Sequence, residues 1–143
     1  MMKIIIGFNE DSRYIASVVA TGVLNAGESY ELKSFDEELS GDLIFACVSQ
    51  KIGFKQNFNL KGRTALVCVG SKKFCSDIER KLKPFKTIRH PQKLLHKIGI
   101  QKPSIEELFR VRAFAEQLVT NLTGKEVLKN REKERIKGYK KQQ

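Results

Sequence analysis

The sequence predicts a single α/β domain of three layers, in which helices cover both faces of a parallel sheet. Segments 43–49 and 64–70 are apolar at nearly every position, which is typical of central strands in a covered parallel sheet. Segments with the 3.6-residue period of helices alternate with the strands along the chain. The length of 143 residues suits one domain with one core, and no internal repeat divides it.

The first predicted elements are a strand, a helix and a second strand. Segment 3–8, KIIIGF, is rich in β-branched residues and predicts a buried strand. We expect Asp11 or Ser12 to cap the following helix and Gly27 to end it in a left-handed conformation. Segment 30–35, YELKSF, predicts the second strand. The apolar stripe of the helix consists of Ile15, Val18, Val19, Gly22, Val23 and Ala26.

Two polar connections flank the third predicted strand. Segment 36–42, DEELSGD, is acidic and predicts a short link into the strand at 43–49. Segment 50–63 has no clear hydrophobic period, so it predicts a loop that leads into the fourth strand at 64–70.

A helix and a short fifth strand follow the fourth strand. Segment 71–83 predicts the helix, and Pro84 ends it because proline cannot continue the backbone hydrogen bonds. Segment 85–88, FKTI, predicts the short strand. The apolar face of the helix carries Phe74, Ile78 and Leu82.

A long helix closes the predicted domain. Segment 90–100 predicts a short helix or an irregular turn before it. Ser104 and Glu107 have the spacing of a capping box, and we expect Gly124 to end the helix. The predicted buried face consists of Ile105, Leu108, Phe109, Ala115, Leu118, Val119 and Leu122.

The predicted domain covers residues 1–123, and residues 124–143 form a basic C-terminal segment. This segment has few apolar residues, which indicates a frayed helix or a disordered tail. Its cations are candidates for contact with an acidic protein or a nucleic acid, although interleaved glutamates weaken their field. The candidate partner-binding residues are Lys125, Lys129, Arg131, Arg135 and Lys137.

Charge and hydropathy restrict the classes of partner. The chain has 27 Lys and Arg against 16 Asp and Glu, a formal net charge of +11, which favours polyanions or acidic surfaces in a salt-dependent way. No apolar run approaches the roughly 20 residues that span a bilayer, so we expect no membrane partner. The start of the chain lacks the cleavage region of a signal peptide, and we therefore expect a cytoplasmic protein.

Sequence motifs give little support to hydrolase, transferase or metal chemistry. Cys47, Cys68 and Cys75 show no C-x-x-C spacing, which indicates buried thiols in a reducing compartment. His90 and His96 are six residues apart, which is not the spacing of a helical ligand pair. We find neither a G-x-S-x-G motif nor a P-loop.

The order of these elements resembles that of the flavodoxin-like family over roughly residues 2–122. The resemblance implies a parallel sheet in the strand order 2-1-3-4-5, with ligands at the carboxyl ends of the strands. Four segments carry it: IASVVATGVLNAG at 15–27, GDLIFACVS at 41–49, NFNLKGRTALVCVGS at 57–71 and KPSIEELFRVRAFAEQLVTNL at 102–122.

The resemblance also implies binding of flavin mononucleotide (FMN) at the loop after the first strand. Family members usually have Ser/Thr-x-Thr-Gly-Asn-Thr there, whose hydroxyls and amides hold the phosphate. In this chain Ser12 keeps a hydroxyl and Asn9 a polar side chain. Glu10 and Asp11 replace Gly and Asn and would repel the phosphate, which Arg13 could partly offset. The candidate cofactor residues of this loop are Phe8, Asn9, Asp11, Ser12 and Arg13.

Two further loops complete the implied flavin site. Ser49, Gln50 and Lys51 follow the third strand, where family members contact the flavin ring. Phe54 is the nearest aromatic candidate to stack on the ring, and core packing explains it equally well. Gly70 and Ser71 could contact the far edge of the site or form an ordinary strand-to-helix turn.

Two functional hypotheses follow from this pattern. The first is an FMN-dependent oxidoreductase or electron carrier, which would need an acidic redox partner because the chain is basic. The second is a flavodoxin-like binding module without flavin, which recognises an acidic protein or a nucleic acid through its basic surface. The acidic first loop favours the second hypothesis, since an Asp11 side chain at the helix N-terminus would occupy the phosphate position itself.

Overall fold

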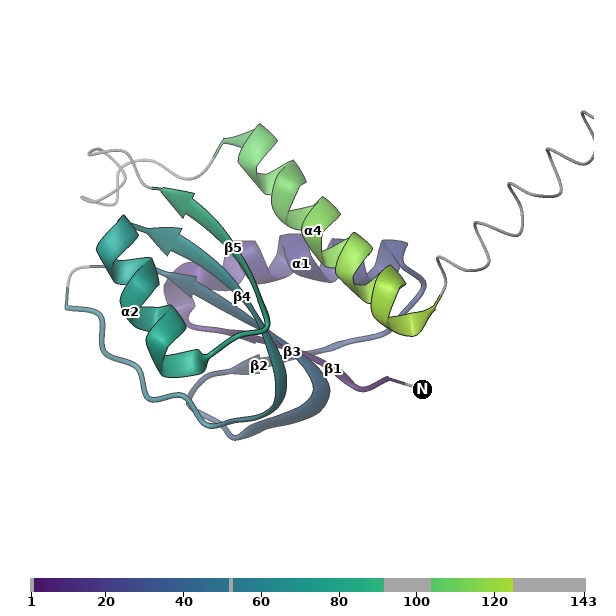
Figure 1. The fold of residues 1–143 in the computed structure, drawn as a ribbon, viewed down its shortest axis with the longest axis horizontal. Helices are drawn as coiled ribbons and strands as arrows, with labels where there is room; N and C mark the ends of the chain where they lie inside the picture. Colours follow the sequence, from purple (N-terminus) through teal and green to yellow (C-terminus); the bar gives the residue numbers. More distant parts are fainter. Residues whose placement is uncertain (1, 52, 92–103, 125–143) are drawn as a thin grey trace, which may run out of the picture.

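A computed structural model describes residues 2–51, 53–91 and 104–124 of the chain. Its centre is a five-stranded parallel sheet in the order β2-β1-β3-β4-β5, which confirms the expected strand order (Figure 1). The strands are β1 (Ile4–Phe8), β2 (Glu31–Ser34), β3 (Leu39–Ser49), β4 (Leu60–Gly70) and β5 (Lys86–Pro91). The described helices are α1 (Arg13–Asn25), α2 (Lys72–Leu82) and α4 (Ile105–Thr123), and a 3-10 turn (Glu10–Ser12) precedes α1.

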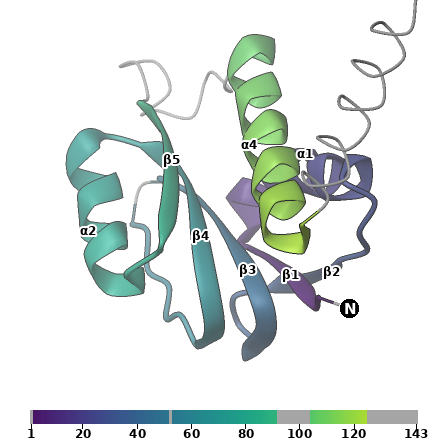
Figure 2. The same ribbon diagram turned by 45° about the vertical axis from the view of Figure 1, so that its right-hand side comes forward.

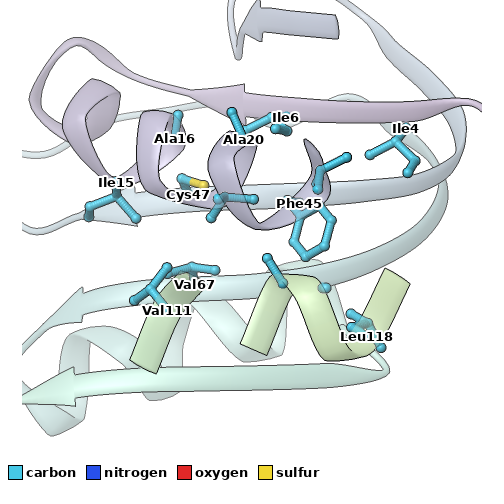
Figure 3. Packing of buried hydrophobic residues seen from close by; sticks show 14 of the residues in the cluster. Ile4, Ile6, Ile15, Ala16, Ala20, Phe45, Cys47, Val67, Val111 and Leu118 are labelled. Carbon is cyan, nitrogen blue, oxygen red and sulfur yellow. The ribbon is translucent and has the colours of Figure 1, made fainter. Parts of the chain in front are cut away.

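Helices α1 and α4 lie together on one face of the sheet, while α2 lies on the other (Figure 2). Gly22 permits the close approach of α1 and α4, because a Cβ atom there would lie 2.5 Å from the carbonyl oxygen of Arg112. Figure 3 shows the core that these two helices bury against the sheet. Its members include Ile4, Ile6, Ile15, Ala16, Phe45, Val67, Val111 and Leu118.

The predicted buried face of α4 is correct in its C-terminal part and wrong in its first turns. Ala115, Leu118 and Val119 are buried as expected, whereas Ile105 is 72% exposed and Phe109 is 52% exposed. Buried contacts begin only at Val111, so the first turns of α4 extend past the core. The helical period predicts which side of the helix a side chain lies on. It does not predict how much of the length of the helix is covered by the rest of the core.

Loops complete the cover of the second face, because α2 spans only part of it. Phe74, Ile78 and Leu82 of α2 pack on this face as predicted. Beside them, Phe35 and Phe58 make an edge-to-face pair with ring centroids 4.9 Å apart. The residues described between β2 and β3, and between β3 and β4, contain no helix.

Strands β3 and β4 begin earlier than the sequence predicts, so parts of the link at 36–42 and of the loop at 50–63 are strand. Leu39 pairs with Leu60 at the start of the two strands. The residues that follow are polar or glycine, which hides the strand from any hydrophobic pattern. Leu39 is fully buried in the second face, and its side chain occupies the space where a Cβ atom of Gly7 would lie.

A bulge bends this early part of β3 and β4. The register shifts between Ser40 and Leu43, so the first residues of the pair leave the plane of the central sheet. Gly62 has a φ of 145°, and a Cβ atom there would lie only 2.0 Å from the carbonyl oxygen of Gly41. The bend therefore requires glycine at position 62.

The two ends of α4 lie where the sequence predicts them, whereas the end of β5 does not. Ser104 caps α4 by accepting a hydrogen bond from the amide of Glu107, and Gly124 ends the helix with a φ of 75°. Strand β5 runs to Pro91, past the predicted end at residue 88, so the start of the predicted turn at 90–100 is strand. The rest of that segment lies outside the described residues. Within the described residues, no helix has the length and apolar character needed to cross a membrane.

Candidate functional site

The loops after β1, β3 and β4 lie side by side at the carboxyl edge of the sheet, because these three strands are neighbours and parallel. The loop after β1 contains Asn9 and the turn to Ser12. The loop after β3 begins at Gln50, and the loop after β4 contains Ser71. The structure therefore brings the predicted cofactor residues of all three loops to one edge, where doubly wound sheets bind ligands.

Ser12 turns inward from the first loop. It is fully buried, and its hydroxyl donates to the carbonyl oxygen of Cys47 at 2.6 Å. The Asn9 side-chain oxygen lies against the same hydroxyl, and the backbone amide of Asn9 donates to it at 3.0 Å. The Ser12 hydroxyl, which the resemblance predicts as a phosphate contact, is thus hydrogen-bonded within the protein and shielded from solvent.

The expected cap of α1 is correct in position for Ser12 but lacks the expected side-chain hydrogen bond, and it is wrong for Asp11. Ser12 occupies the cap position, but its side chain accepts no hydrogen bond from the first amides of the helix. Asp11 instead forms an ion pair with Lys51, with 3.1 Å between Oδ2 and Nζ. A 3-10 turn precedes the helix, closed by a hydrogen bond from the Ser12 amide to the Asn9 carbonyl at 3.0 Å. Asp11 therefore joins the first and second loops rather than closing the helix N-terminus.

Ser49, at the end of β3, is also buried and bonded within the protein. Its side chain is hydrogen-bonded to the hydroxyl of Tyr14, on the first turn of α1. Burial raises the pKa of Tyr14 above its ordinary value, the Ser49 hydrogen bond opposes this shift, and the charges of Glu107 and Asp11 add to it. Sequence reasoning missed Tyr14, because it lies outside the apolar stripe of α1 and matches no motif.

Gln50 connects the second and third loops. Its backbone amide donates to the carbonyl oxygen of Val69 at 2.8 Å. Its side-chain oxygen accepts a hydrogen bond from the backbone amide of Ser71 at 2.7 Å. The Ser71 hydroxyl in turn caps α2 by accepting from the amide of Phe74 at 3.1 Å. Two amides at the N-terminus of α2, those of Ser71 and Phe74, are therefore satisfied by side chains of the protein.

Phe54 and Gly70 belong to the packing of the second face. The Phe54 ring meets Phe74 edge to face, with centroids 5.1 Å apart. A Cβ atom at Gly70 would lie 2.7 Å from the Phe74 ring and 2.8 Å from Cβ of Gln50. Phe54 is thus held by its packing partners on this face, and Gly70 is the residue that lets the second and third loops touch.

The remaining candidates lie at the border of the site or outside the described residues. Phe8 is partly buried against the first core, and Arg13 is exposed on α1. The described residues contain no group of three His, Cys, Asp or Glu side chains that could hold a metal ion. The predicted partner-binding residues Lys125, Lys129, Arg131, Arg135 and Lys137 lie outside the described residues.

Solved structures similar to this one include two flavodoxins. A flavodoxin from Streptococcus pneumoniae TIGR4 superposes with a TM-score of 0.54 at 14% identity, covering 83% of this chain and 97% of that chain. The chain has the flavodoxin-like fold. A flavodoxin from the domain Archaea superposes with a TM-score of 0.55 at 10% identity, covering 86% of this chain and 99% of that chain. No protein-family model and no curated protein matches the sequence.

The flavodoxin-like fold implies FMN at the carboxyl edge, but the residues found there do not fit its phosphate. The Ser12 hydroxyl is buried and donates to Cys47, and the Ser71 amide is occupied by Gln50. The exposed groups of the first loop are Glu10 and Asp11, which carry the same sign of charge as a phosphate. At this edge of the flavodoxin-like fold, side chains of the three loops therefore bond to other groups of the protein.

Proposed function

We propose that this protein is a flavodoxin-like binding module that works without flavin and recognises a polyanionic partner. The observation that carries the proposal is the buried Ser12 hydroxyl, which donates to the Cys47 carbonyl where a flavin phosphate would need it. Fold alone does not establish a cofactor, because binding depends on the groups that the loops present.

Opening the site to a phosphate costs free energy at two places. Withdrawing Ser12 leaves the buried Cys47 carbonyl without its donor, at a cost of roughly 1–3 kcal/mol. A carboxylate about 5 Å from a phosphate charge adds about 3 kcal/mol of repulsion at an effective dielectric constant near 20. Glu10 contributes such a charge, whereas the charge of Asp11 is partly offset by its ion pair with Lys51.

The charge of the chain supports a polyanionic partner, either a nucleic acid or an acidic protein. The formal net charge is +11, and it is unevenly distributed. Residues 53–91 contain ten Lys and Arg but only Asp77 and Glu79 as acidic residues. Residues 2–51 contain four Lys and Arg against eight Asp and Glu. Such segregation produces a directed positive field, which attracts polyanions more strongly than the same charge spread evenly.

Two measurements on the purified full-length protein test the proposal. The first is an absorption spectrum with a titration of FMN fluorescence, in which we expect no flavin bands and no saturable quenching. The second is retention on immobilised heparin. We expect the protein to bind heparin at low salt and to be eluted as the salt concentration rises, because binding releases counterions. Flavin binding, or passage through heparin at low salt, contradicts the proposal.

An FMN-dependent electron carrier is the second candidate function. The similarity covers almost the whole length of two flavodoxins, and the three loops of this chain leave the same edge of the sheet. In this candidate, Asn9 and Ser12 would hold the phosphate, and residues 49–51 would contact the ring. The protein would supply binding and orientation, FMN the electron chemistry, and an acidic protein would be the redox partner. Saturable FMN binding in the same titration decides for this candidate.

A further inference from the structure

A second group of residues gathers at the opposite edge of the sheet, where β4 and β5 begin. Register places Lys86 beside Ala65, and the amide of Phe85 donates to the carbonyl of Thr64 at 3.0 Å. The carboxyl end of α2 lies beside them, since Lys81 shares a groove of about 320 Å³ with Gly62 and Thr64. We call this surface the basic edge, and its residues are Arg63, Lys81, Lys83, Phe85 and Lys86.

The cations of the basic edge lack acidic partners among the described residues. Three other cations of residues 53–91 are paired: Arg80 with Asp77, Arg89 with Glu79, and Lys61 with Glu38. The structure gives no ion pair for the exposed Lys55, Lys72 and Lys73, which lie away from the aromatic ring described below. The structure gives no ion pair for the cations of the basic edge within residues 2–51, 53–91 and 104–124, and all of them are exposed. These unpaired cations are Arg63, Lys81, Lys83 and Lys86. Lys81 also lines a second groove together with Asp36, Glu37 and Glu38, so acidic side chains lie on its other side.

Compensation of the helix dipole explains only part of this cluster. Cations near the carboxyl end of a helix are stabilising, which suits Lys81 and Lys83 at the end of α2. Arg63 and Lys86 lie on strands, where no such dipole acts. Lys83 also adopts a left-handed conformation with a φ of 47°, a position where glycine is ordinarily preferred. The chain thus places a charge at a position where glycine would relieve backbone strain.

An exposed aromatic ring lies among the cations. Phe85 is 41% exposed, and the guanidinium carbon of Arg63 lies 5.7 Å from its ring centroid. An acidic protein would use the charges without needing the ring. A single-stranded nucleic acid uses both, because its phosphates meet cations while a base stacks on the aromatic side chain. The bases of a duplex are stacked within the helix and cannot reach the ring in this way.

We propose that the basic edge binds single-stranded nucleic acid, with one base stacked on Phe85 and phosphates held by the four unpaired cations. This inference deepens the proposed function and rests on it, since it names the surface and the class of polyanion. It places the binding surface at the edge of the sheet opposite to the one where flavodoxin-like proteins hold flavin.

Fluorescence anisotropy with the full-length protein tests this inference. The probe is a fluorescein-labelled single-stranded RNA of about 20 nucleotides, which is longer than typical single-domain sites. Phe85→Ala should weaken binding of this RNA about tenfold, the effect expected for one lost base stack. The same variant should bind a duplex of equal length, and heparin, as the wild type does.

Charge variants separate the basic edge from the rest of the positive surface. The double variant Arg63→Gln with Lys86→Gln should weaken RNA binding and reduce the slope of log affinity against log salt by about 1.4, since each phosphate contact of a single strand contributes about 0.7. The matched control is Lys72→Gln with Lys73→Gln, which removes the same charge from exposed positions on the first turn of α2. We expect the control to bind RNA with an affinity within about twofold of the wild type, because salt screens the interaction of its distant charges with the RNA.

Lys83→Gly distinguishes a binding role from a structural one. Glycine should raise the melting temperature, because it removes the strain of a left-handed lysine. The same variant should bind RNA more weakly, because a phosphate contact is lost. A purely structural role for Lys83 predicts unchanged RNA binding, which contradicts our inference.

The outcomes also distinguish this inference from the proposed function. Heparin retention with unchanged RNA affinity in the Phe85 and Arg63/Lys86 variants overturns the basic edge and leaves the proposed function standing. Tighter binding of polyglutamate than of RNA overturns the inference in favour of an acidic protein partner. Saturable FMN binding, or absence of all polyanion binding, overturns the proposed function together with the inference.

Discussion

The two edges of the sheet differ in how their polar groups are used. At the carboxyl edge, Ser12, Ser49 and Gln50 all bond to other groups of the protein, and Asp11 pairs with Lys51. At the amino edge of β4 and β5, four exposed cations have no ion pair in the described part of the chain, and one of them, Arg63, lies over the partly exposed ring of Phe85. The edge that the fold assigns to ligands is satisfied internally, and the other edge is not.

This difference shows that topology fixes where loop residues come together but does not decide whether they can bind a ligand. Parallel strands bring loop residues together at their carboxyl ends whether or not those residues can bind a ligand. Binding needs groups whose hydrogen bonds and charges are still unsatisfied, because each group already bonded must first be released. The predictions below test the contrast between the two edges in order of decreasing expected effect.

Gly62→Ala should cause the largest effect, because it disrupts the bend from which the amino edge is built. The added Cβ atom would meet the Gly41 carbonyl at 2.0 Å, and the φ of 145° is strained for alanine. We expect a loss of about 3 kcal/mol or more in the free energy of unfolding, measured by urea titration. The control is Gly53→Ala, which has open space at a φ of 69° and should cost about 1 kcal/mol. Equal losses would mean that backbone strain alone governs both sites.

Ser12→Ala tests whether the carboxyl edge is held together by its internal bonds. The variant leaves the Cys47 carbonyl and the Asn9 amide without their buried partner, so we expect a loss of about 2 kcal/mol in the free energy of unfolding. Ser17→Ala is the control, because the exposed Ser17 hydroxyl only donates to the Arg13 carbonyl at 3.2 Å. A Ser12 variant as stable as the Ser17 variant would show that the first loop is free to rearrange around a ligand.

The ion pair of Glu79 and Arg89 tests the distinction between paired and unpaired cations. The Arg89 hydrogen bond lowers the pKa of Glu79, so this interaction stabilises the fold above the ordinary pKa of Glu79 and is lost as the pH falls through its lowered value. Glu79→Gln should therefore be less stable than the wild type near neutral pH, by less than the loss for Ser12→Ala. Thermal unfolding across pH should show the two proteins converging in acid; a difference that persists at low pH contradicts this account.

Asp11→Asn with Glu10→Gly should have the smallest effect and sharpens the interpretation of the carboxyl edge. Removing the exposed Asp11–Lys51 pair should cost less than about 1 kcal/mol in stability. If repulsion alone excludes flavin, this variant gains FMN affinity. We expect no saturable FMN quenching, because the Ser12 hydroxyl still donates to Cys47. Binding of FMN by this variant would show that charge alone closes the site.

Hydrophobic patterns predicted the elements that carry apolar residues at a regular period. The strand interiors at 43–49 and 64–70 and the apolar face of α2 were found in this way. The patterns failed where the structure uses glycine and charged residues in a ladder, as in the early parts of β3 and β4. The patterns also placed the exposed Ile105 in the core, because the apolar stripe of a helix does not show where along the helix the core ends.

The sequence by itself determined the α/β class, the alternation of strands and helices, and the Ser104 and Gly124 ends of α4, because these depend on residues close together in the chain. Only the tertiary structure decided which polar groups remain available. The Ser12–Cys47 and Gln50–Ser71 hydrogen bonds join residues far apart in sequence, and strand register brings Arg63 to Phe85. Such contacts follow from how strands pair in space, and a single sequence gives residue types without their neighbours.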